Sequence, residues 1–279
     1  ARFGEPRNAW HPVAWLGRAA APLGRWLVGC RPALAFAGGA LAWLAAAAAL
    51  GLGAAWLQAQ LLAAGPFWAV PLLALALKPC FAWRLLRDEV AAVEAALGEA
   101  GLGERGLAAG RARLARIVSR ETGALDAAEV REAAIETLAE NLNDSLVAPL
   151  WWFALAGLPG AVVYRFANTL DAMWGYRGRW EWAGKWAARA DDVLSWGPAR
   201  LTALLLCPPA HWRRLPREAA RTPSPNGGWP MAAMALRLGV RLRKPGVYVL
   251  NDAAPSPGAA DLAQALRHAS RAAALAAAL

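Results

Sequence analysis

Three carboxylates stand four residues apart in the segment ETLAENLND: Glu136, Glu140 and Asp144. On a helix this spacing makes one acidic stripe in which like charges repel, so a compensating cation is expected. Mg²⁺ is the natural candidate, because it takes oxygen ligands from one or two carboxylates together with substrate phosphates. Asn141 and Asn143 add amide oxygens nearby. The alternative is a solvated polar face paired with arginine, and the helix alone does not decide between the two.

Two further polar clusters follow along the chain. Asn168 and Asp171 are three residues apart, so they share a helix face. The third cluster consists of Arg189, Asp191, Asp192 and Arg200. Arginine binds phosphate oxygens bidentately and carboxylates hold a metal ion, so a pocket made of these groups suits a nucleotide. The sequence has no Walker A motif and no Gly-x-Gly-x-x-Gly, so any ATP site would be an unusual one.

The composition indicates a membrane protein. Of the 279 residues, 58% are hydrophobic and only 18% are charged, and 16 are Trp; soluble domains carry about 25% charged residues, and Trp favours membrane interfaces. The net charge of +10 fits a positive-inside signal, attraction to anionic lipid, or binding of anionic substrates. Nucleic-acid binding is not indicated, because no basic run is interleaved with aromatics on a polar segment. The three Cys and three His residues are scattered and predict neither a disulfide framework nor a metal centre.

The apolar segments predict a multi-pass arrangement. No charged residue occurs from 32 to 77, and a Gly65-Pro66 turn divides this run, so we expect a transmembrane hairpin over 33–83 with helices at 33–62 and 66–83. Arginine flanks both of its ends, which puts them in the cytoplasm by the positive-inside rule. Residues 84–143 then read as cytoplasmic helices, with Asp126 as an N-cap of the last one.

The segment 145–172 is the key prediction. It is apolar with polar clusters at both ends, but Gly157 and the Pro159-Gly160 pair are poor in an uninterrupted helix and good in a turn. Two arms of about twelve residues would reach only about 18 Å each, too short to cross a bilayer. We therefore expect a re-entrant or protein-buried hairpin that returns Asp171 to the side that holds Asp144; a straight span is the alternative.

Residues 173–268 read as site-bearing helices and loops, and 269–279 as the start of a C-terminal membrane helix. No strand pattern of weight appears. The predicted fold class is all-α: a polytopic integral membrane protein with a re-entrant helical hairpin and a cytoplasmic helical region.

Six blocks occur in order along the chain: HPVAWLGR (11–18), IVSRET (117–122), ETLAENLNDSLVAPLWW (136–152), NTLDAMWGY (168–176), AARADDVLSWGPARL (187–201) and SPNGGWPMAAMALRLGVRL (224–242). Together they resemble the CobD/CbiB family of cobalamin biosynthesis, the adenosylcobinamide-phosphate synthases. The resemblance covers nearly the whole chain, and six blocks in sequence are far more specific than any one of them.

The resemblance implies a ligase of the bacterial inner membrane, multi-pass, with its active site facing the cytoplasm. Such an enzyme joins a carboxylate of adenosylcobyric acid to the amine of aminopropanol phosphate, or of ethanolamine phosphate, using ATP and Mg²⁺. Further expected partners are membrane lipid, other late enzymes of the pathway and a second copy of the chain. A membrane transporter and a corrinoid-binding scaffold are the competing functions.

The implied division of labour is a hypothesis. The metal ligands would be Glu140, Asp144 and Asp171, and Asp191 or Asp192 would accept the proton of the amine. The groups that neutralise developing phosphate charge would be Arg120, Arg189 and Arg200. The remaining polar ligands would be Asn141, Asn168, Asn226 and His11. Of these, His11 is either a substrate contact or a helix-end polar group, and Asn226 either makes a turn or binds.

Overall fold

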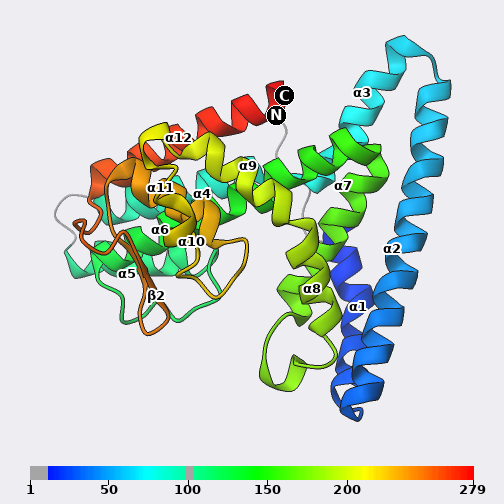
Figure 1. Cartoon of the computed structure of the whole chain (residues 1–279), viewed down its shortest axis with the longest axis horizontal. Coiled ribbons are helices and arrows are strands. Elements are labelled where there is room, and N and C mark those ends of the chain that lie inside the picture. Colours follow the sequence, from blue (N-terminus) through cyan, green and yellow to red (C-terminus); the bar gives the residue numbers. More distant parts are fainter. Residues whose placement is uncertain (1–11, 99–102) are drawn as a thin grey trace. The chain divides into compact units, whose positions relative to one another are not determined.

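The computed structural model describes residues 12–98 and 103–279, which are almost entirely helical (Figure 1). The chain forms two compact units, each built from two stretches of sequence. The first unit holds the residues up to Phe81 together with Ala148–Ser195, and the second holds Ala82–Val147 and Trp196–Leu279. The predicted helical class is therefore confirmed in its main feature.

The elements described in the first unit are α1 (Pro12–Val28), α2 (Pro32–Ala63), α3 (Pro66–Leu77), the 3₁₀ turn η1 (Lys78–Cys80), α7 (Ala148–Trp174), the 3₁₀ turn η3 (Gly178–Trp180) and α8 (Lys185–Leu194). Helix α7 is the centre of this unit, because α1, α2, α3 and α8 all pack against it. The core that α2, α7 and α8 share is aromatic and apolar, with Trp43, Phe166 and Trp174 among its buried side chains.

The predicted apolar hairpin is present in α2 and α3 (Figure 1). Gly65 has φ of 87°, a left-handed value that glycine adopts without steric cost, and it makes the turn between them. The predicted end of the second helix, at residue 83, is wrong: α3 stops at Leu77 and a 3₁₀ turn follows. Pro79 is the physical reason, because proline has no backbone N–H to continue the α-helical hydrogen bonds and its ring crowds the preceding turn.

A sharp break interrupts α7, as the sequence predicted. Ala156 and Gly157 leave helical geometry, and Gly157 has φ of 64°. Leu158 N, at the start of the second arm, donates to Gln58 Oε1 of α2 at 2.6 Å. In a straight helix, Trp152 and Gly160 would be separated by about 12 Å along the helix axis. Here a Cβ on Gly160 would lie only 2.3 Å from the carbonyl oxygen of Trp152. The two arms therefore converge at this kink.

Within residues 12–98 and 103–279, two helical stretches are long and apolar enough to cross a membrane, Pro32–Ala63 and Ala127–Trp174. A third is possible by the same measure if Phe67–Cys80 and Trp83–Gly98 count as one span. These lengths support a membrane protein. A re-entrant insertion of the α7 arms stays a prediction, as does the cytoplasmic location of residues 84–143.

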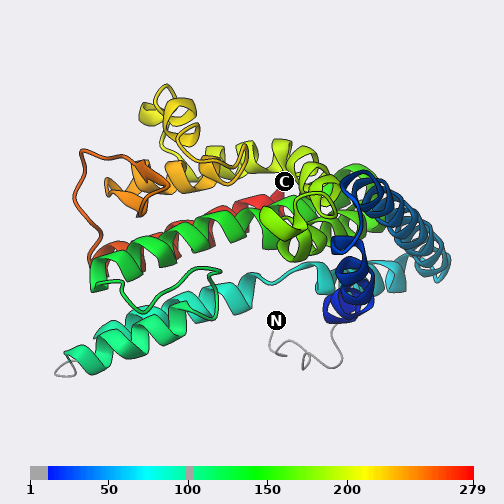
Figure 2. The same ribbon diagram turned by 90° about the horizontal axis from the view of Figure 1, so that it is seen from below.

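The elements described in the second unit are α4 (Trp83–Gly98), α5 (Glu104–Leu114), α6 (Ala127–Leu142), the π-helical turn η2 (Asn143–Val147), α9 (Trp196–Leu206), the 3₁₀ turn η4 (Pro209–His211), α10 (Leu215–Ala219), α11 (Gly228–Leu238), β1 (Leu242–Lys244), β2 (Tyr248–Leu250) and α12 (Ala259–Ala278). Helix α6 is central: α4, α5, α11 and α12 pack around it, and Figure 2 shows α6 and α12 side by side. Consequently nearly every α6 residue from Val130 to Leu142 is buried.

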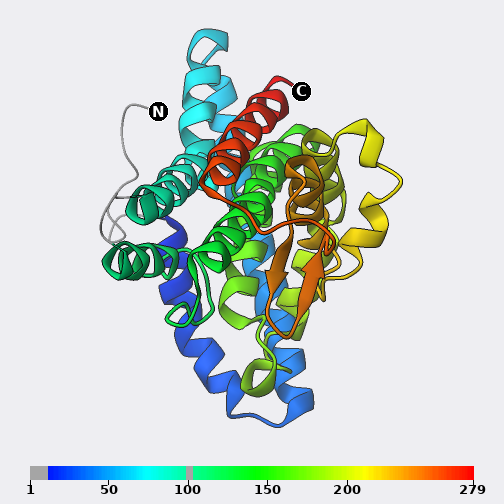
Figure 3. The ribbon, with the colours of Figure 1, turned by 90° about the vertical axis from the view of Figure 1, so that its left-hand side faces the viewer.

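A two-stranded hairpin corrects the expectation that strands are absent. Strands β1 and β2 pair antiparallel, with Lys244 opposite Tyr248 (orange arrows in Figure 3). A turn over Pro245-Gly246 joins them, in which Gly246 has φ of 71° and Val247 N donates to the Lys244 carbonyl at 2.9 Å. Each strand has only three residues, too few for alternation to be visible in the sequence.

The C-terminal segment is one continuous helix, α12, in the structure. Its buried face, which includes Leu262, Ala265 and Ala269, packs on α4, α6 and α9. The predicted start of a membrane helix at 269 falls within this helix and stays a prediction.

Candidate active site

The acidic stripe lies on α6 and on the η2 turn that follows it, and α6 itself begins with a strong N-cap. Glu129 N donates to Asp126 Oδ1 at 2.8 Å, and Asp126 N donates to Glu129 Oε2 at 3.0 Å, so the predicted N-cap is confirmed as a full capping box. One turn further on, Glu132 is completely buried and Glu136 is 4% exposed. A buried carboxylate is costly unless it is paired, so the partners of these two residues define the site.

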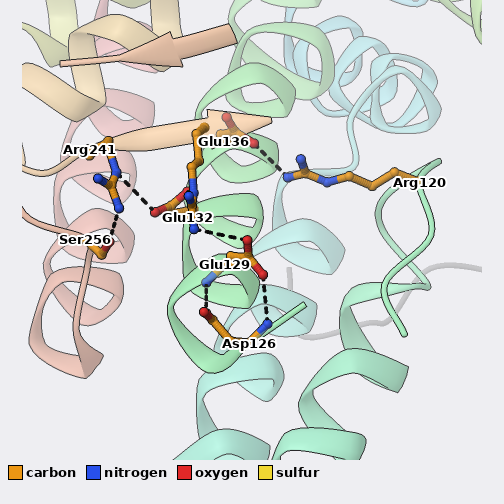
Figure 4. Close-up of polar contacts among 8 residues, drawn as sticks. Arg120, Asp126, Glu129, Glu132, Glu136, Arg241 and Ser256 are labelled. Carbon is orange, nitrogen blue, oxygen red and sulfur yellow. Dashed lines mark hydrogen bonds and ion pairs between the residues drawn. The ribbon is translucent and has the colours of Figure 1, made fainter. Parts of the chain in front are cut away.

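Arg120 is the partner of Glu136. It reaches α6 from the segment that follows α5, and its Nη2 lies 2.7 Å from Glu136 Oε2 (Figure 4). Tyr248 of the hairpin lies near the same carboxylate: burial raises the pKa of its hydroxyl well above the usual range, and the charge of Glu136 raises it further. The Arg120 guanidinium, predicted to neutralise phosphate charge, is thus engaged with the acidic stripe itself.

Arg243 of β1 and Arg241, which directly precedes that strand, both lie near Glu132. Arg243 Nε lies 3.3 Å from Glu132 Oε2, and Arg243 Nη2 lies 3.0 Å from Glu129 Oε1. Arg241 Nε lies 3.8 Å from Glu132 Oε1, and its Nη2 donates to Ser256 Oγ at 2.7 Å (Figure 4). Glu132 was not predicted as a site residue, although the four-residue spacing of the stripe extends back to it.

Glu140 lies against the loop that precedes α11. A Cβ on Gly227 would come within 2.7 Å of Glu140 Oε1, so this carboxylate and the loop backbone are in close contact. Arg200 Nη1 donates to Asn226 Oδ1 of the same loop at 2.6 Å. The structure therefore brings together Glu140, Asn226 and Arg200, three residues that the sequence placed in one site.

The stripe ends in the π-helical turn η2. Asn143 Nδ2 donates to Asp144 Oδ1 at 2.8 Å, and Thr202 of α9 donates to Asn143 Oδ1 at 3.1 Å. Asn141 Nδ2 donates to the Thr137 carbonyl of its own helix at 3.0 Å. A π-turn widens the helix locally and is often found at functional sites, so Asp144 sits at an irregular point of the backbone.

The other predicted residues belong to the first unit. Asp171 folds over the end of α7, since a Cβ on Gly175 would lie 2.1 Å from its Oδ1. On α8, Arg189 Nη1 lies 3.7 Å from Asp192 Oδ2, and Arg189 is largely exposed. Burial raises the pKa of Asp192, and the Arg189 charge opposes that rise. Asn168 and Asp191 are partly buried, and His11 lies outside the described residues.

Comparison with known proteins identifies the chain. The profile of one family, described as CobD/Cbib protein, matches residues 1–276. The chain belongs to this family.

Curated relatives agree with that assignment. A probable cobalamin biosynthesis protein CobD from Thermococcus kodakarensis is 43% identical, over 88% of this chain and 80% of its own length. The cobalamin biosynthesis proteins CobD of Dehalococcoides mccartyi and Rhodobacter capsulatus are 36% and 40% identical, over 82% and 83% of their lengths. No solved structure matches this chain.

The CobD/Cbib chain offers carboxylates of the right chemistry for Mg²⁺, which uses few protein ligands beside phosphate oxygens. Among residues 12–98 and 103–279, no three His, Cys, Asp or Glu side chains cluster as a metal centre. Glu140 and Asp144 are close in sequence and in the same unit, whereas Asp171 belongs to the other unit. A metal site made of all three, and with it a shared pocket for Asp144 and Asp171, stays a prediction.

Proposed function

We propose that this chain is an ATP- and Mg²⁺-dependent amide ligase of cobalamin biosynthesis. It would join a carboxylate of adenosylcobyric acid to the amine of aminopropanol phosphate, or of ethanolamine phosphate, and release adenosylcobinamide phosphate. Family membership over residues 1–276 carries the proposal, and the names of the curated relatives support the pathway.

The proposed chemistry has two steps. A carboxylate does not react with an amine at neutral pH and must first be activated. An oxygen of the adenosylcobyric acid carboxylate therefore attacks the γ-phosphorus of ATP, which gives an acyl phosphate and releases ADP. The amine then attacks the acyl carbon, an amide bond forms, and inorganic phosphate leaves. Asp191 or Asp192 would take the proton that the amine loses.

Bound Mg²⁺ would neutralise the charge of the phosphate oxygens. Glu140, Asp144 and Asp171 are the side chains proposed to hold it. Arg120 and Arg189 would lie near the phosphate groups and neutralise their negative charge. Asn141, Asn168, Asn226 and His11 are the proposed polar contacts of the ligands. The packing of Glu140 against the loop at Gly227 supports a fixed carboxylate rather than a solvated one.

The proposed setting is the bacterial inner membrane, with the site on the cytoplasmic side. Lipid would surround α2, along which Leu41, Leu52 and Trp56 are more than half exposed. Other late enzymes of the pathway are proposed partners because the product passes to further steps. A second copy of the chain is a further proposed partner.

A transporter or a corrinoid-binding scaffold is the alternative. The ligase is favoured because arginines from two separate segments pair with carboxylates of α6: Arg120 from one, and Arg241 and Arg243 from the other. Such fixed ion pairs suit a built site better than a path along which a substrate moves.

The test is ATP hydrolysis by the detergent-solubilised full chain. ADP should accumulate only when adenosylcobyric acid and aminopropanol phosphate are both present, in step with the amide product seen by mass spectrometry. Asp144→Ala and Asp171→Ala should abolish ligation without unfolding the protein, whereas Asp88→Ala, at a half-exposed side chain, should not. Wild-type protein that moves the corrinoid across proteoliposomes without ATP-dependent ligation would refute the proposal.

A further inference from the structure

Arg200 binds the protein through both nitrogens at the end of its guanidinium. Its Nη1 donates to Asn226 Oδ1 at 2.6 Å and to the Trp196 carbonyl at 2.9 Å, and its Nη2 donates to the Pro225 carbonyl at 3.1 Å. The end-on fork of Nη1 and Nη2, which would otherwise bind a phosphate, is therefore occupied by the chain.

Two indole rings flank the same group. The Arg200 guanidinium carbon lies 4.7 Å from the ring centroid of Trp196 and 4.6 Å from that of Trp229, both within the range of cation–π attraction. Burial lowers the pKa of the guanidinium. Stacking of this kind depends on the planar shape of arginine, which lysine does not reproduce.

The loop that Arg200 contacts, residues 222–227, is closed by its own contacts. Ser224 Oγ accepts from Asn226 N at 3.2 Å and from Gly227 N at 3.0 Å. Thr222 Oγ1 lies 3.0 Å from the Ser224 carbonyl oxygen. Thr222 and Asn226 are 7% and 5% exposed. These contacts tie the side chains of Thr222 and Ser224 to the loop backbone.

Glycine in this loop gives space to the acidic stripe. A Cβ on Gly227 would meet Glu140 Oε1 at 2.7 Å, and a Cβ on Gly228, the first residue of α11, would meet the Ala219 carbonyl oxygen at 2.2 Å. The carboxylate of Glu140 therefore rests on a surface whose position follows from the loop.

We propose that Arg200 is a positioning residue: it fixes the loop through Asn226, and the loop in turn fixes the carboxylate of Glu140. This role replaces direct phosphate binding by Arg200 and rests on the ligase function proposed above. The chain of contacts runs from Arg200 to Asn226, then to Gly227 and Glu140, all within the second unit.

Steady-state kinetics of three variants test this role. Arg200→Lys, Asn226→Ala and Gly227→Ala should each lower kcat of ligation, by about 100-fold for a displacement near 1 Å, and in Arg200→Lys and Gly227→Ala the KM for ATP should stay close to wild type. Arg217→Lys, at an exposed arginine of α10 in the same unit, is the matched control and should behave as wild type. A raised KM for ATP or for the aminoalkyl phosphate in Arg200→Lys alone, with Gly227→Ala active, would overturn the proposal.

A second readout does not depend on activity. In protein labelled with 5-fluorotryptophan, Trp196→Phe and Trp229→Phe assign two of the fluorine resonances. Both resonances should shift in Arg200→Lys, and that of Trp229 should shift in Asn226→Ala. Unchanged resonances in both variants would refute the positioning role. If wild-type protein shows no ligation, the proposed function fails, while the fluorine spectra still decide whether Arg200 holds the loop.

Discussion

Arg120 Nη2 lies 2.7 Å from Glu136 Oε2, and the Glu136 side chain is 5% exposed while that of Arg120 is 18% exposed. The two residues come from different segments and meet in the interior of the second unit. Removing one partner of such a pair leaves a buried charge without compensation, and this strongly lowers the stability of the fold. Replacing both partners by apolar residues of the same size costs far less.

Removing Arg120 should therefore destabilise the protein strongly. Arg120→Ala is expected to lower the free energy of unfolding by about 3–5 kcal/mol, measured by chemical denaturation in detergent. Combining it with Glu136→Gln should recover part of the loss, because the amide carries no charge. The control is Arg116→Ala, whose guanidinium pairs with Glu89 at 2.9 Å but is 57% exposed; it should cost about 1 kcal/mol or less.

The kink of α7 should depend on the amide of Gln58. Gln58→Leu removes the acceptor for Leu158 N and leaves a backbone N–H unpaired, so it should cost about 1–3 kcal/mol. Gln60→Leu makes the same change two residues away on the exposed side of α2. Thermal unfolding of both variants in detergent is the measurement, and equal stabilities would contradict a role of Gln58 in the kink.

The β1–β2 hairpin should depend on Glu132. Glu132→Ala leaves Arg243 and Arg241 without their buried carboxylate. Amide hydrogen exchange over residues 242–250 should become about ten times faster for each 1.4 kcal/mol by which the free energy of opening the hairpin falls. Arg213→Ala, at an exposed position of the same unit, should leave exchange unchanged. Loss of protection throughout the second unit, rather than in the hairpin, would contradict a local clamp.

Asp192 should make stability fall as pH rises through a mildly acidic window. Burial raises the pKa of this carboxyl above its usual 3.8. Between that value and the raised one, the folded protein still holds a proton that the unfolded chain has lost, so rising pH favours unfolding. Asp192→Asn should remove this part of the pH dependence, and Arg189→Ala should enlarge it.

Denaturant titrations that begin at the usual Asp pKa of 3.8 and extend upward to neutral pH test the Asp192 prediction in wild type and in the two variants. Identical pH dependences for wild type and Asp192→Asn would show that the carboxyl titrates as in the unfolded chain. Activity need not be measured, so this test stands apart from the proposed catalytic role of Asp192.

Local features of the fold were predictable from the sequence. The uncharged run 32–77 and Gly65-Pro66 predicted two helices joined by a turn, and Asp126 was predicted as the cap of α6. Gly157 and Pro159 predicted the break in α7. Each of these predictions rests on the backbone preferences of residues near one another in the chain. The three-residue strands of the hairpin were missed because they are too short to show a period.

The main helices, the acidic stripe and the family could be inferred from the order of residues along the chain. Which charges compensate one another follows from the folded arrangement alone: Arg120 and Glu136 are 16 residues apart, and Arg243 and Glu129 are 114 apart. The contact of Arg200 with Asn226 likewise comes from packing, since the two residues are 26 apart. Helical spacing fixes which side chains share a face, but the partner across that face depends on how distant helices pack, and no local pattern records it.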